Sequence, residues 1–381
     1  MILFNRPGLA GNEFAYMKAA LAAGHLSGNG PMTKACHAWL EARVGCAKAL
    51  LTHSCTAALE MAAVLLDLGP GDEVVMPSFA FVTTANAFVL RGATPVFVDI
   101  QSDTMNVAPA CIEAAITKST KAIVALHYAG VACDMGRISA LAVEHGLKIV
   151  EDAAQGVLAS HRGTPLGAIG HLGAYSFHET KNVSSGEGGA LLVNDARLVE
   201  RAEIVWEKGT NRNQFFRGQV DKYTWVDIGS SYLPSEIIAA FLLAQLEQAD
   251  RLTETRLRIW QRYHDAFEEL EEARLLRRPC IPPYCTHNGH IYYVLVKDLA
   301  ARTAFLNDLH AHGVGAVFHY VPLHSSPAGR RFGRCGGDLS TTDDVSNRLV
   351  RLPLWTDMTD AQQSTVIRVV IEAARRLQAT T

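Results

Sequence analysis

Residues 47–99 of this chain read AKALLTHSCTAALEMAAVLLDLGPGDEVVMPSFAFVTTANAFVLRGATPVFVD. Three short apolar runs in this stretch alternate with two segments of helical apolar spacing. The runs are Ala47–Thr52, Glu73–Met76 and Pro95–Asp99, and the helical segments are Thr56–Asp67 and Asn86–Arg91. Strands that alternate with helices predict an α/β domain with a parallel sheet. Because the runs are apolar almost throughout, we expect both faces of this sheet to be covered.

The alternation continues to about residue 195. It adds four apolar runs, at Ala122–Leu126, Lys148–Glu151, Ala174–Phe177 and Ala190–Val193. It also adds two segments of helical spacing, at Pro109–Ile116 and Met135–His145. The sequence therefore predicts a doubly wound, mostly parallel sheet of seven strands. In such sheets ligands bind at the carboxyl ends of the strands.

The pattern changes after Val193. Residues 195–210 have helical spacing, residues 211–232 are polar, aromatic and irregular, and a long helical region runs from Pro234, in its expected first turn, to about Glu272. We place a domain boundary near residue 250, which gives a large domain at 1–250 and a smaller α+β domain at 251–381. The smaller domain is expected to hold strands at Ile291–Val296 and Val314–His319, a helix at Arg302–His312 and two closing helices.

The composition is that of a globular protein, with 49% hydrophobic and 19% charged residues. A net charge of -3 with no block of like charges gives no sign of a basic surface that would bind nucleic acid. The longest apolar run, Ile237–Ala244, is too short to cross a bilayer, and the N-terminus has no signal-peptide pattern. We expect a soluble, cytoplasmic protein with neither a nucleic-acid nor a membrane partner.

One group of residues has the chemistry of a metal site. Cys280, Cys285, His287 and His290 offer four zinc ligands within eleven residues. Their spacing matches no zinc-finger template, and residues 278–283 (RPCIPP) have the character of a loop that enters a strand. We therefore expect no metal site.

Polar residues follow two of the predicted strands. Asp152 comes directly after the run at Lys148–Glu151, where a carboxylate can pair with a protonated ring nitrogen or cap a helix. Lys181 follows the run at Ala174–Phe177. Partial burial and a nearby cationic ring would lower the pKa of such a lysine and suit it to forming an imine, although a solvated loop lysine is the alternative.

Two more strand ends carry candidate ligand-binding residues. Residues 52–59 (THSCTAAL) join the first strand to a helix, and free amides at a helix start favour an anion such as phosphate, or an ordinary cap. The chain has no nucleotide-binding P-loop. Phe81 follows the second strand, where its ring would lie against a planar cofactor or pack in the core.

Together these stretches resemble the DegT/DnrJ/StrS family of sugar-nucleotide aminotransferases. The matching stretches are 54–59 (SCTAAL), 77–81 (PSFAF), 151–155 (EDAAQ) and 176–182 (SFHETKN), and the resemblance extends from Phe4 to residues 318–324 (FHYVPLH). It implies the aspartate-aminotransferase-like fold (fold type I of the pyridoxal-phosphate-dependent transferases). It also implies pyridoxal 5′-phosphate (PLP) as the cofactor.

The resemblance also implies roles for single residues. Lys181 would form the imine with PLP and carry a proton between the cofactor and the sugar carbon. A dehydratase branch of the family has histidine at this position, so a lysine here implies transamination. The residues implied to bind the cofactor are Asp152 at the pyridine nitrogen, Phe81 against the ring, Gln155 beside the phenolic oxygen, and Cys55, Thr56 and Ser176 around the phosphate.

Residues 208–225 (KGTNRNQFFRGQVDKYTW) resemble one subgroup of the family. That subgroup transfers an amino group from L-glutamate to C4 of dTDP-4-keto-6-deoxy-D-glucose, giving dTDP-4-amino-4,6-dideoxy-D-galactose for enterobacterial common antigen. The cationic and amide side chains of this loop would bind the nucleotide diphosphate, or lie on a solvated loop. The candidate substrate-binding residues are Asn211, Arg212, Arg217 and Lys222 of the loop, with His319 and Tyr320 closing over the sugar or serving in packing.

The resemblance further implies a homodimer with shared active sites. Most of the family has an asparagine that reaches the PLP phosphate of the neighbouring subunit, and Ser231 stands at that position here. A shorter contact in trans is therefore expected. Two alternatives remain open: amination at C3 or of a UDP-linked keto sugar, and a non-catalytic PLP-binding regulator.

Overall fold

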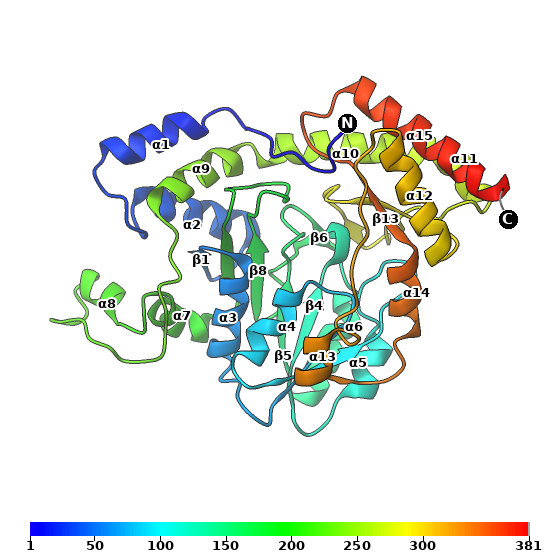
Figure 1. The fold of residues 1–381 in the computed structure, drawn as a ribbon. Helices are drawn as coiled ribbons and strands as arrows, with labels where there is room; N and C mark the ends of the chain where they lie inside the picture. Colours follow the sequence, from blue (N-terminus) through cyan, green and yellow to red (C-terminus); the bar gives the residue numbers. More distant parts are fainter. Residues whose placement is uncertain (380–381) are drawn as a thin grey trace.

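The computed structural model of the protein describes residues 1–379 (Figure 1). A sheet of eight strands forms its centre, in the order β1-β9-β8-β5-β4-β2-β3-β12. Strand β9 runs antiparallel to both β1 and β8, and the other neighbouring pairs are parallel. The strands are β1 (Lys48–Thr52), β2 (Glu73–Pro77), β3 (Thr94–Val98), β4 (Thr120–Leu126), β5 (Lys148–Asp152), β8 (Leu172–Ser176), β9 (Gly189–Val193) and β12 (Arg334–Cys335).

All seven predicted strands are present, and the structure adds an eighth. Strand β12 lies far along the chain and pairs in parallel with β3 at the edge of the sheet. It has two residues, and neither belongs to an apolar run. The expectation of seven strands was wrong by one for that reason. The ion pair of Arg334 with Glu73 of β2 holds this edge, with 2.6 Å between Nε and Oε1.

Helices cover both faces of the sheet, as the apolar strands predict. Alternate residues of a strand point to opposite faces. Val74 and Met76 therefore pack against one group of helices, while Val75 packs against the other. The first group is α3 (Cys55–Leu65), α4 (Val82–Val89) and α7 (Val199–Trp206), and the second is α5 (Pro109–Ala115) and α6 (Met135–His145). Helices α2 (Pro31–Val44) and α9 (Glu236–Glu247) cover the end of the sheet near β1.

The C-terminal part builds a second core around a two-stranded sheet. Strand β11 (Tyr292–Leu295) pairs antiparallel with β13 (Leu349–Leu352), and helices α10, α12 and α15 pack on it. Ile2 at the opposite end of the chain belongs to the same core and pairs with Val314. The helices are α10 (Ala249–Ala266), α11 (Glu268–Glu272), α12 (Leu299–Ala311), α13 (Pro327–Phe332), α14 (Ser340–Arg348) and α15 (Asp360–Ala379).

Two details of this second core differ from expectation. Helix α12 begins at Leu299, because the Asp298 side chain caps it by accepting a hydrogen bond from the amide of Ala301 at 2.9 Å. The strand expected at Val314–His319 was wrong. Single bridges join Val314 to Ile2 and Val317 to Arg351, and the chain then leaves the sheet so that His319 and Tyr320 line a cavity. The domain boundary near residue 250 remains a prediction.

The remaining elements lie at the periphery. Helix α1 (Glu13–Ala22) packs on α9, which follows Pro234 and is capped by Ser235. The segment with α8 (Arg212–Phe216) projects from the body of the molecule, beyond α7 (Figure 1). The short elements are η1 (Tyr128–Gly130), β6 (Ser160–His161), β7 (Thr164–Pro165), η2 (Ala196–Leu198) and β10 (Cys285–Thr286). Within residues 1–379, none of the helices is both long and apolar enough to span a membrane.

Candidate active site

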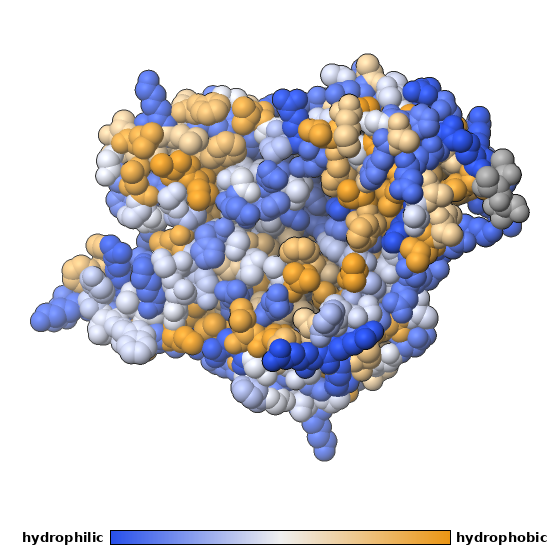
Figure 2. Space-filling view, in the orientation of Figure 1, coloured by the Kyte–Doolittle hydropathy of each residue, from blue (hydrophilic) through white to orange (hydrophobic). Residues whose placement is uncertain are grey.

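A cavity of about 490 Å³ opens at the carboxyl ends of β1, β5 and β8. Its opposite wall comes from the C-terminal part of the chain, through the segment with His319 and through β13. Figure 2 shows the surface hollowed between these two parts. The cavity brings together nine of the predicted site residues, namely Cys55, Thr56, Phe81, Asp152, Gln155, Ser176, Lys181, His319 and Tyr320.

The start of α3 forms one end of the cavity. Ser54 caps the helix by accepting a hydrogen bond from the amide of Ala57 at 3.1 Å. The amides of Cys55 and Thr56 have no partner among residues 1–379, so two donors at the positive end of the helix dipole remain available for an anion. A Cβ on Gly189 would lie 2.4 Å from the Cys55 nitrogen. Only glycine therefore permits this approach of β9 to the helix start.

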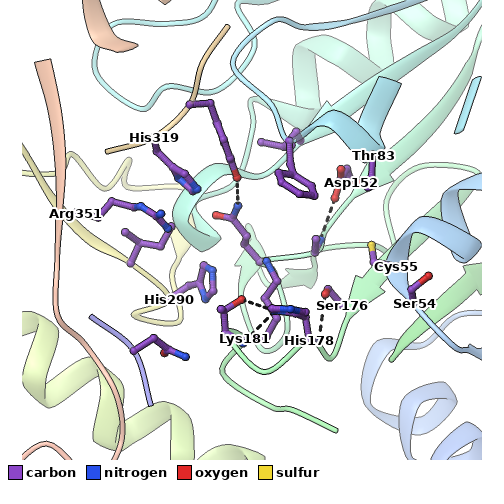
Figure 3. Close-up of a pocket in the computed structure, with 18 of the residues that line it drawn as sticks. Ser54, Cys55, Thr83, Asp152, Ser176, His178, Lys181, His290, His319 and Arg351 are labelled. Carbon is purple, nitrogen blue, oxygen red and sulfur yellow. Dashed lines mark hydrogen bonds between the residues drawn. The ribbon is translucent and has the colours of Figure 1, made fainter. Parts of the chain in front are cut away.

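Asp152 ends strand β5 and is 4% exposed. Its Oδ2 accepts a hydrogen bond from the Thr84 hydroxyl at 2.7 Å, and its Oδ1 accepts one from the amide of Ala154 at 3.2 Å. These two donors fix the direction of the carboxylate. Figure 3 draws it beside Thr83, on the same cavity as Cys55 and Lys181.

Gln155 and Tyr320 join the two walls of the cavity. The Gln155 Oε1 accepts a hydrogen bond from the amide of Ala129 at 2.6 Å, while its Nε2 donates to the Tyr320 hydroxyl. The Tyr320 ring stacks on His319, with 3.6 Å between centroids. Phe81 is 54% exposed and lines the cavity, so it is not a core residue; the neighbouring Phe79 is fully buried instead.

Lys181 follows β8 on a turn whose backbone bonds to His178. Its amine has no hydrogen-bond or ion-pair partner among the residues that the structure describes. Burial lowers the pKa of Lys181, and this effect outweighs the opposing influence of the Cys55 thiol and the Asp152 carboxylate. A partly buried amine without a partner and with a lowered pKa is suited to act as a nucleophile.

A buried amide network lies behind Lys181. The Oδ1 of Asn182 lies 2.8 Å from Nδ1 of His290, and its Nδ2 donates to the Asn288 carbonyl at 2.9 Å. The Asn288 side chain donates in turn to the carbonyls of Gln155 and Val157, both at 2.8 Å. Burial, together with nearby cations such as Lys181, lowers the pKa of His290 well below its ordinary value. This neutral network fixes the loop after Lys181 against the segment around Gln155.

Sequence reasoning missed two arginines of the cavity, Arg256 and Arg351. Arg256 lies on the buried face of α10, between Leu252 and Trp260 at helical spacing, and Arg351 interrupts the apolar strand β13. A charged residue on a buried face was the signal that would have found both. Burial lowers the pKa of Arg256 to about 9 and also lowers the pKa of Arg351.

The predicted residues of the 208–225 loop and Ser231 do not line this cavity within one chain. Arg212 pairs with the buried Glu207 at 3.2 Å and Arg217 with Glu203 at 2.7 Å. The Asn211 side chain accepts a hydrogen bond from the amide of Thr224 at 2.7 Å. Lys222 is exposed, and Ser231 is exposed beside the Glu207 backbone. Their predicted roles in a neighbouring subunit remain predictions.

The four residues weighed as zinc ligands each have other surroundings. His290 bonds to Asn182, His287 packs edge-on against Trp260, the Cys285 sulfur accepts a hydrogen bond from the amide of Ala132, and Cys280 is exposed. Among residues 1–379, no three histidine, cysteine or acidic side chains gather as metal ligands.

Comparison with known proteins explains this arrangement. The sequence profile of the DegT/DnrJ/EryC1/StrS aminotransferase family matches residues 8–371. The chain belongs to this family. It is 32% identical to the spore coat polysaccharide biosynthesis protein SpsC of Bacillus subtilis, over 96% of this chain and 95% of that protein.

Solved structures agree with this family assignment. The aminotransferase TlmJ of Streptoalloteichus hindustanus superposes with a TM-score of 0.91 at 31% identity, covering 99% of this chain and 100% of that one. The PLP form of the putative sugar aminotransferase Spr1654 of Streptococcus pneumoniae has a TM-score of 0.91 at 25% identity and covers 99% of each chain. The protein is thus a PLP-dependent sugar aminotransferase with the predicted aspartate-aminotransferase-like fold.

The residues of the cavity fit this cofactor. Two unpaired amides and the Ser176 hydroxyl offer donors for a phosphate, while Gly189 keeps the space at the helix start free of a side chain. Asp152 and Lys181 supply a carboxylate and a free amine in the same cavity. Since this donor set matches the phosphate, ring nitrogen and aldehyde of PLP, the cavity is where we place it.

Proposed function

We propose that this aminotransferase transfers the amino group of L-glutamate to C4 of dTDP-4-keto-6-deoxy-D-glucose. The products are 2-oxoglutarate and dTDP-4-amino-4,6-dideoxy-D-galactose; the carbonyl oxygen of the sugar leaves as water, and a water molecule supplies the keto oxygen of 2-oxoglutarate. The observation that carries the aminotransferase chemistry is the convergence of Lys181, Asp152 and the start of α3 on one cavity. The loop at 208–225 supports the choice of sugar, through its resemblance to that subgroup.

Lys181 has the central role in this proposal. Bound PLP supplies an electron-withdrawing ring that stabilises negative charge on the carbon next to the transferred nitrogen. The Lys181 amine would attach the cofactor, then take a proton from the α-carbon of glutamate and return one to C4 of the sugar. Asp152, oriented by Thr84, would keep the proton on the ring nitrogen. The amides of Cys55 and Thr56 would hold the phosphate.

We further propose that the loop with α8 reads the diphosphate of a neighbouring subunit's substrate. It projects from the body of the subunit, and its arginines are exposed apart from their ion pairs with Glu203 and Glu207 (Figure 1). A guanidinium can bind a phosphate through two hydrogen bonds. Glu207 is buried and Glu203 is largely buried, so each arginine would keep its ion pair and offer its remaining guanidinium nitrogens to the phosphate.

The apolar surface supports a homodimer. Hydrophobic residues gather over α1 and α9 in Figure 2, and the exposed ones include Leu9, Phe14 and Leu21. Phe216 and Trp225 on the projecting loop are 65% and 79% exposed. Large exposed aromatics are enriched at the centres of protein interfaces. A two-fold dimer that covers both regions would bring the loop, with Ser231, to the partner's cavity.

Half-reaction kinetics test the proposed substrate. The amino form of the enzyme is mixed with a panel of dTDP- and UDP-linked keto sugars, and the aminated carbon of each product is assigned by NMR. We expect the dTDP-linked 4-keto-6-deoxyhexose to react with the highest kcat/KM and to carry the new amino group at C4. Amination at C3, or a preference for a UDP sugar, would refute the proposed substrate and leave the family assignment unchanged.

A further inference from the structure

The imidazole of His290 belongs to the wall of the active-site cavity. The residue is 7% exposed, and its Nε2 forms no hydrogen bond with any of residues 1–379. Figure 3 shows the ring beside Lys181, on the same side of the cavity as Arg351. Buried polar atoms in proteins are nearly always hydrogen-bonded. An unpaired ring nitrogen at a cavity wall is therefore available to a ligand.

The neighbouring amides determine which ring nitrogen of His290 carries the proton. Nδ2 of Asn182 donates to the Asn288 carbonyl at 2.9 Å, so Oδ1 of Asn182 is the atom that lies 2.8 Å from Nδ1 of His290. Because an amide oxygen can only accept, Nδ1 has to donate, and it carries the ring proton. The neutral ring then has a lone pair at Nε2, which makes Nε2 a hydrogen-bond acceptor.

The charges around His290 keep its ring neutral. Burial lowers the pKa of His290 well below its ordinary value. The nearby cations Lys181, Arg256 and Arg351 act in the same direction. Arg256 is held in place because it donates to the carbonyls of Gly289 and His290, at 3.3 and 2.7 Å. The Nε2 lone pair thus remains unprotonated in the working pH range.

The same charges decide which kind of donor suits Nε2. An ammonium group would be repelled by the cations on this side of the cavity, whereas a hydroxyl can donate a hydrogen bond without carrying a charge. Carboxylates and ionised phosphates have no proton to donate. Among the groups of an amino-acid donor and a nucleotide-linked keto sugar, a sugar hydroxyl is therefore the best match for Nε2.

We propose that Nε2 of His290 accepts a hydrogen bond from the C3 hydroxyl of the keto sugar. This inference rests on the proposed function, in which C4 of the sugar is the carbon that reacts at Lys181. In a 4-keto-6-deoxyhexose, C4 has two ring neighbours: C3 bears a hydroxyl, while C5 bears the ring oxygen and a methyl group. The C3 hydroxyl is thus the hydroxyl next to the reacting carbon, and His290 lies beside the reacting lysine.

This contact gives His290 a role in specificity. A bound sugar with the C3 hydroxyl pairs the Nε2 lone pair, whereas a 3-deoxy sugar leaves that lone pair buried and unpaired. Sites that hydrogen-bond a substrate hydroxyl reject analogues that lack it. The contact would also hold C3 at His290 and thereby leave C4, rather than C3, at Lys181.

The test compares the dTDP-linked 4-keto-6-deoxyhexose with its 3-deoxy analogue. His290→Asn can place an amide nitrogen where Nδ1 was and keep the bond to Asn182, but it has no atom at the Nε2 position. His290→Gln can place an amide oxygen near that position. We expect the wild-type kcat/KM to favour the hydroxylated sugar by at least about tenfold. This preference should fall to within about twofold in His290→Asn and be partly retained in His290→Gln.

Binding without turnover provides a second readout. The amino form of the enzyme cannot react with an aminated sugar, so calorimetry gives the Kd of the aminated product and of its 3-deoxy analogue. His290→Asn should remove the difference between these Kd values and leave the glutamate half-reaction within about threefold of wild type. His161→Asn is the matched control, since His161 is also 7% exposed and its buried Nε2 lacks a partner among the described residues, but it does not line the cavity. This control should keep the wild-type preference.

Three results would overturn the inference. A wild-type enzyme that reacts equally well with both sugars would exclude a contact with the C3 hydroxyl. A loss confined to the glutamate half-reaction in His290→Asn would assign His290 to the amino donor. Equal losses for both sugars and for glutamate, together with a lower Tm, would limit His290 to supporting Asn182. Failure of the proposed function is distinguishable, because the wild-type enzyme would then aminate another carbon or fail to react with the dTDP-linked 4-keto sugar.

Discussion

The side-chain amide of Gln155 donates a hydrogen bond to the hydroxyl of Tyr320, with 3.2 Å between the two atoms. Gln155 follows strand β5 of the large sheet, whereas Tyr320 belongs to the segment that leaves the small core. This bond crosses the cavity and holds the Tyr320 ring at the cavity wall.

We predict that Tyr320→Phe lowers kcat/KM of the sugar half-reaction by roughly threefold to tenfold, because one neutral hydrogen bond is lost. Burial raises the pKa of Tyr320, so its hydroxyl stays protonated in the working pH range and the pH profile should keep its shape. Cofactor retention, measured by dialysis and absorbance, should be unchanged. A variant that loses PLP as well would place Tyr320 in cofactor binding instead.

Lys181→Ala should abolish turnover and the visible absorption of the bound cofactor, because no other amine in the cavity is free to attach PLP. The control is Lys121→Ala, which removes an exposed lysine of β4. Absorbance spectra of both purified proteins, with circular dichroism to verify folding, provide the measurement. Retained absorption and activity in Lys181→Ala would refute the assignment.

Asp152→Asn should still bind PLP yet lose activity by several orders of magnitude, since an amide cannot keep the ring nitrogen protonated. Asp152 also accepts a hydrogen bond from the amide of Ala154, so the experiment has to distinguish a role at the ring nitrogen from simple capping of the backbone. Asp134→Asn is the matched control, because Asp134 caps α6 by accepting from the amide of Arg137. Steady-state rates for both variants decide the matter: similar small losses would make Asp152 only a cap.

Mixed dimers test the proposal that each active site is formed by two subunits. A hybrid of Lys181→Ala with Arg212→Ala would hold one site with both changes and one with neither. Random exchange should therefore restore about a quarter of the wild-type activity, since half of the dimers are hybrid and each hybrid has one intact site. As a control, Lys181→Ala mixed with Asp152→Asn should restore nothing, because both residues belong to the same chain's cavity. No recovery with Arg212→Ala, once hybrids are verified, would show that each site is formed by one chain.

The apoenzyme should gain stability when Lys181 is replaced by methionine. Burial lowers the pKa of Lys181, so the folded state binds this proton less readily than the unfolded chain. The lysine therefore opposes folding at and below neutral pH, and the penalty disappears as the pH rises to the ordinary lysine pKa. Urea unfolding of the PLP-free proteins should show the largest gain at low pH. A gain that does not depend on pH would point to packing rather than charge.

The large sheet was predictable because its strands are buried on both faces and therefore appear as apolar runs in the sequence. Strand β12 was not, because Arg334–Cys335 is held by pairing with β3 and by the ion pair with Glu73. The position of Lys181 and Asp152 in one cavity was predictable, because both are polar residues that follow apolar runs. Arg351 lies about 170 residues from Lys181 in the sequence, and only the fold of the small core brings the two together. Local sequence pattern does not show that two residues so far apart in the chain line the same cavity.

The pairing of Ile2 with Val314 constrains the order in which the chain can assemble. Ile2 leaves the ribosome some 300 residues before its partner, so it has to stay unpaired while the large sheet folds. Closing a loop of this length is entropically unfavourable, and the cost grows slowly with length. Chains that stop before α12 would leave Ile2 without Phe305, Leu309 and Val314, its companions in the small core. Premature termination in this region should therefore leave the apolar side chain of Ile2 exposed in the nascent chain. Exposed hydrophobic surface of this kind makes a chain prone to aggregation and is bound by chaperones.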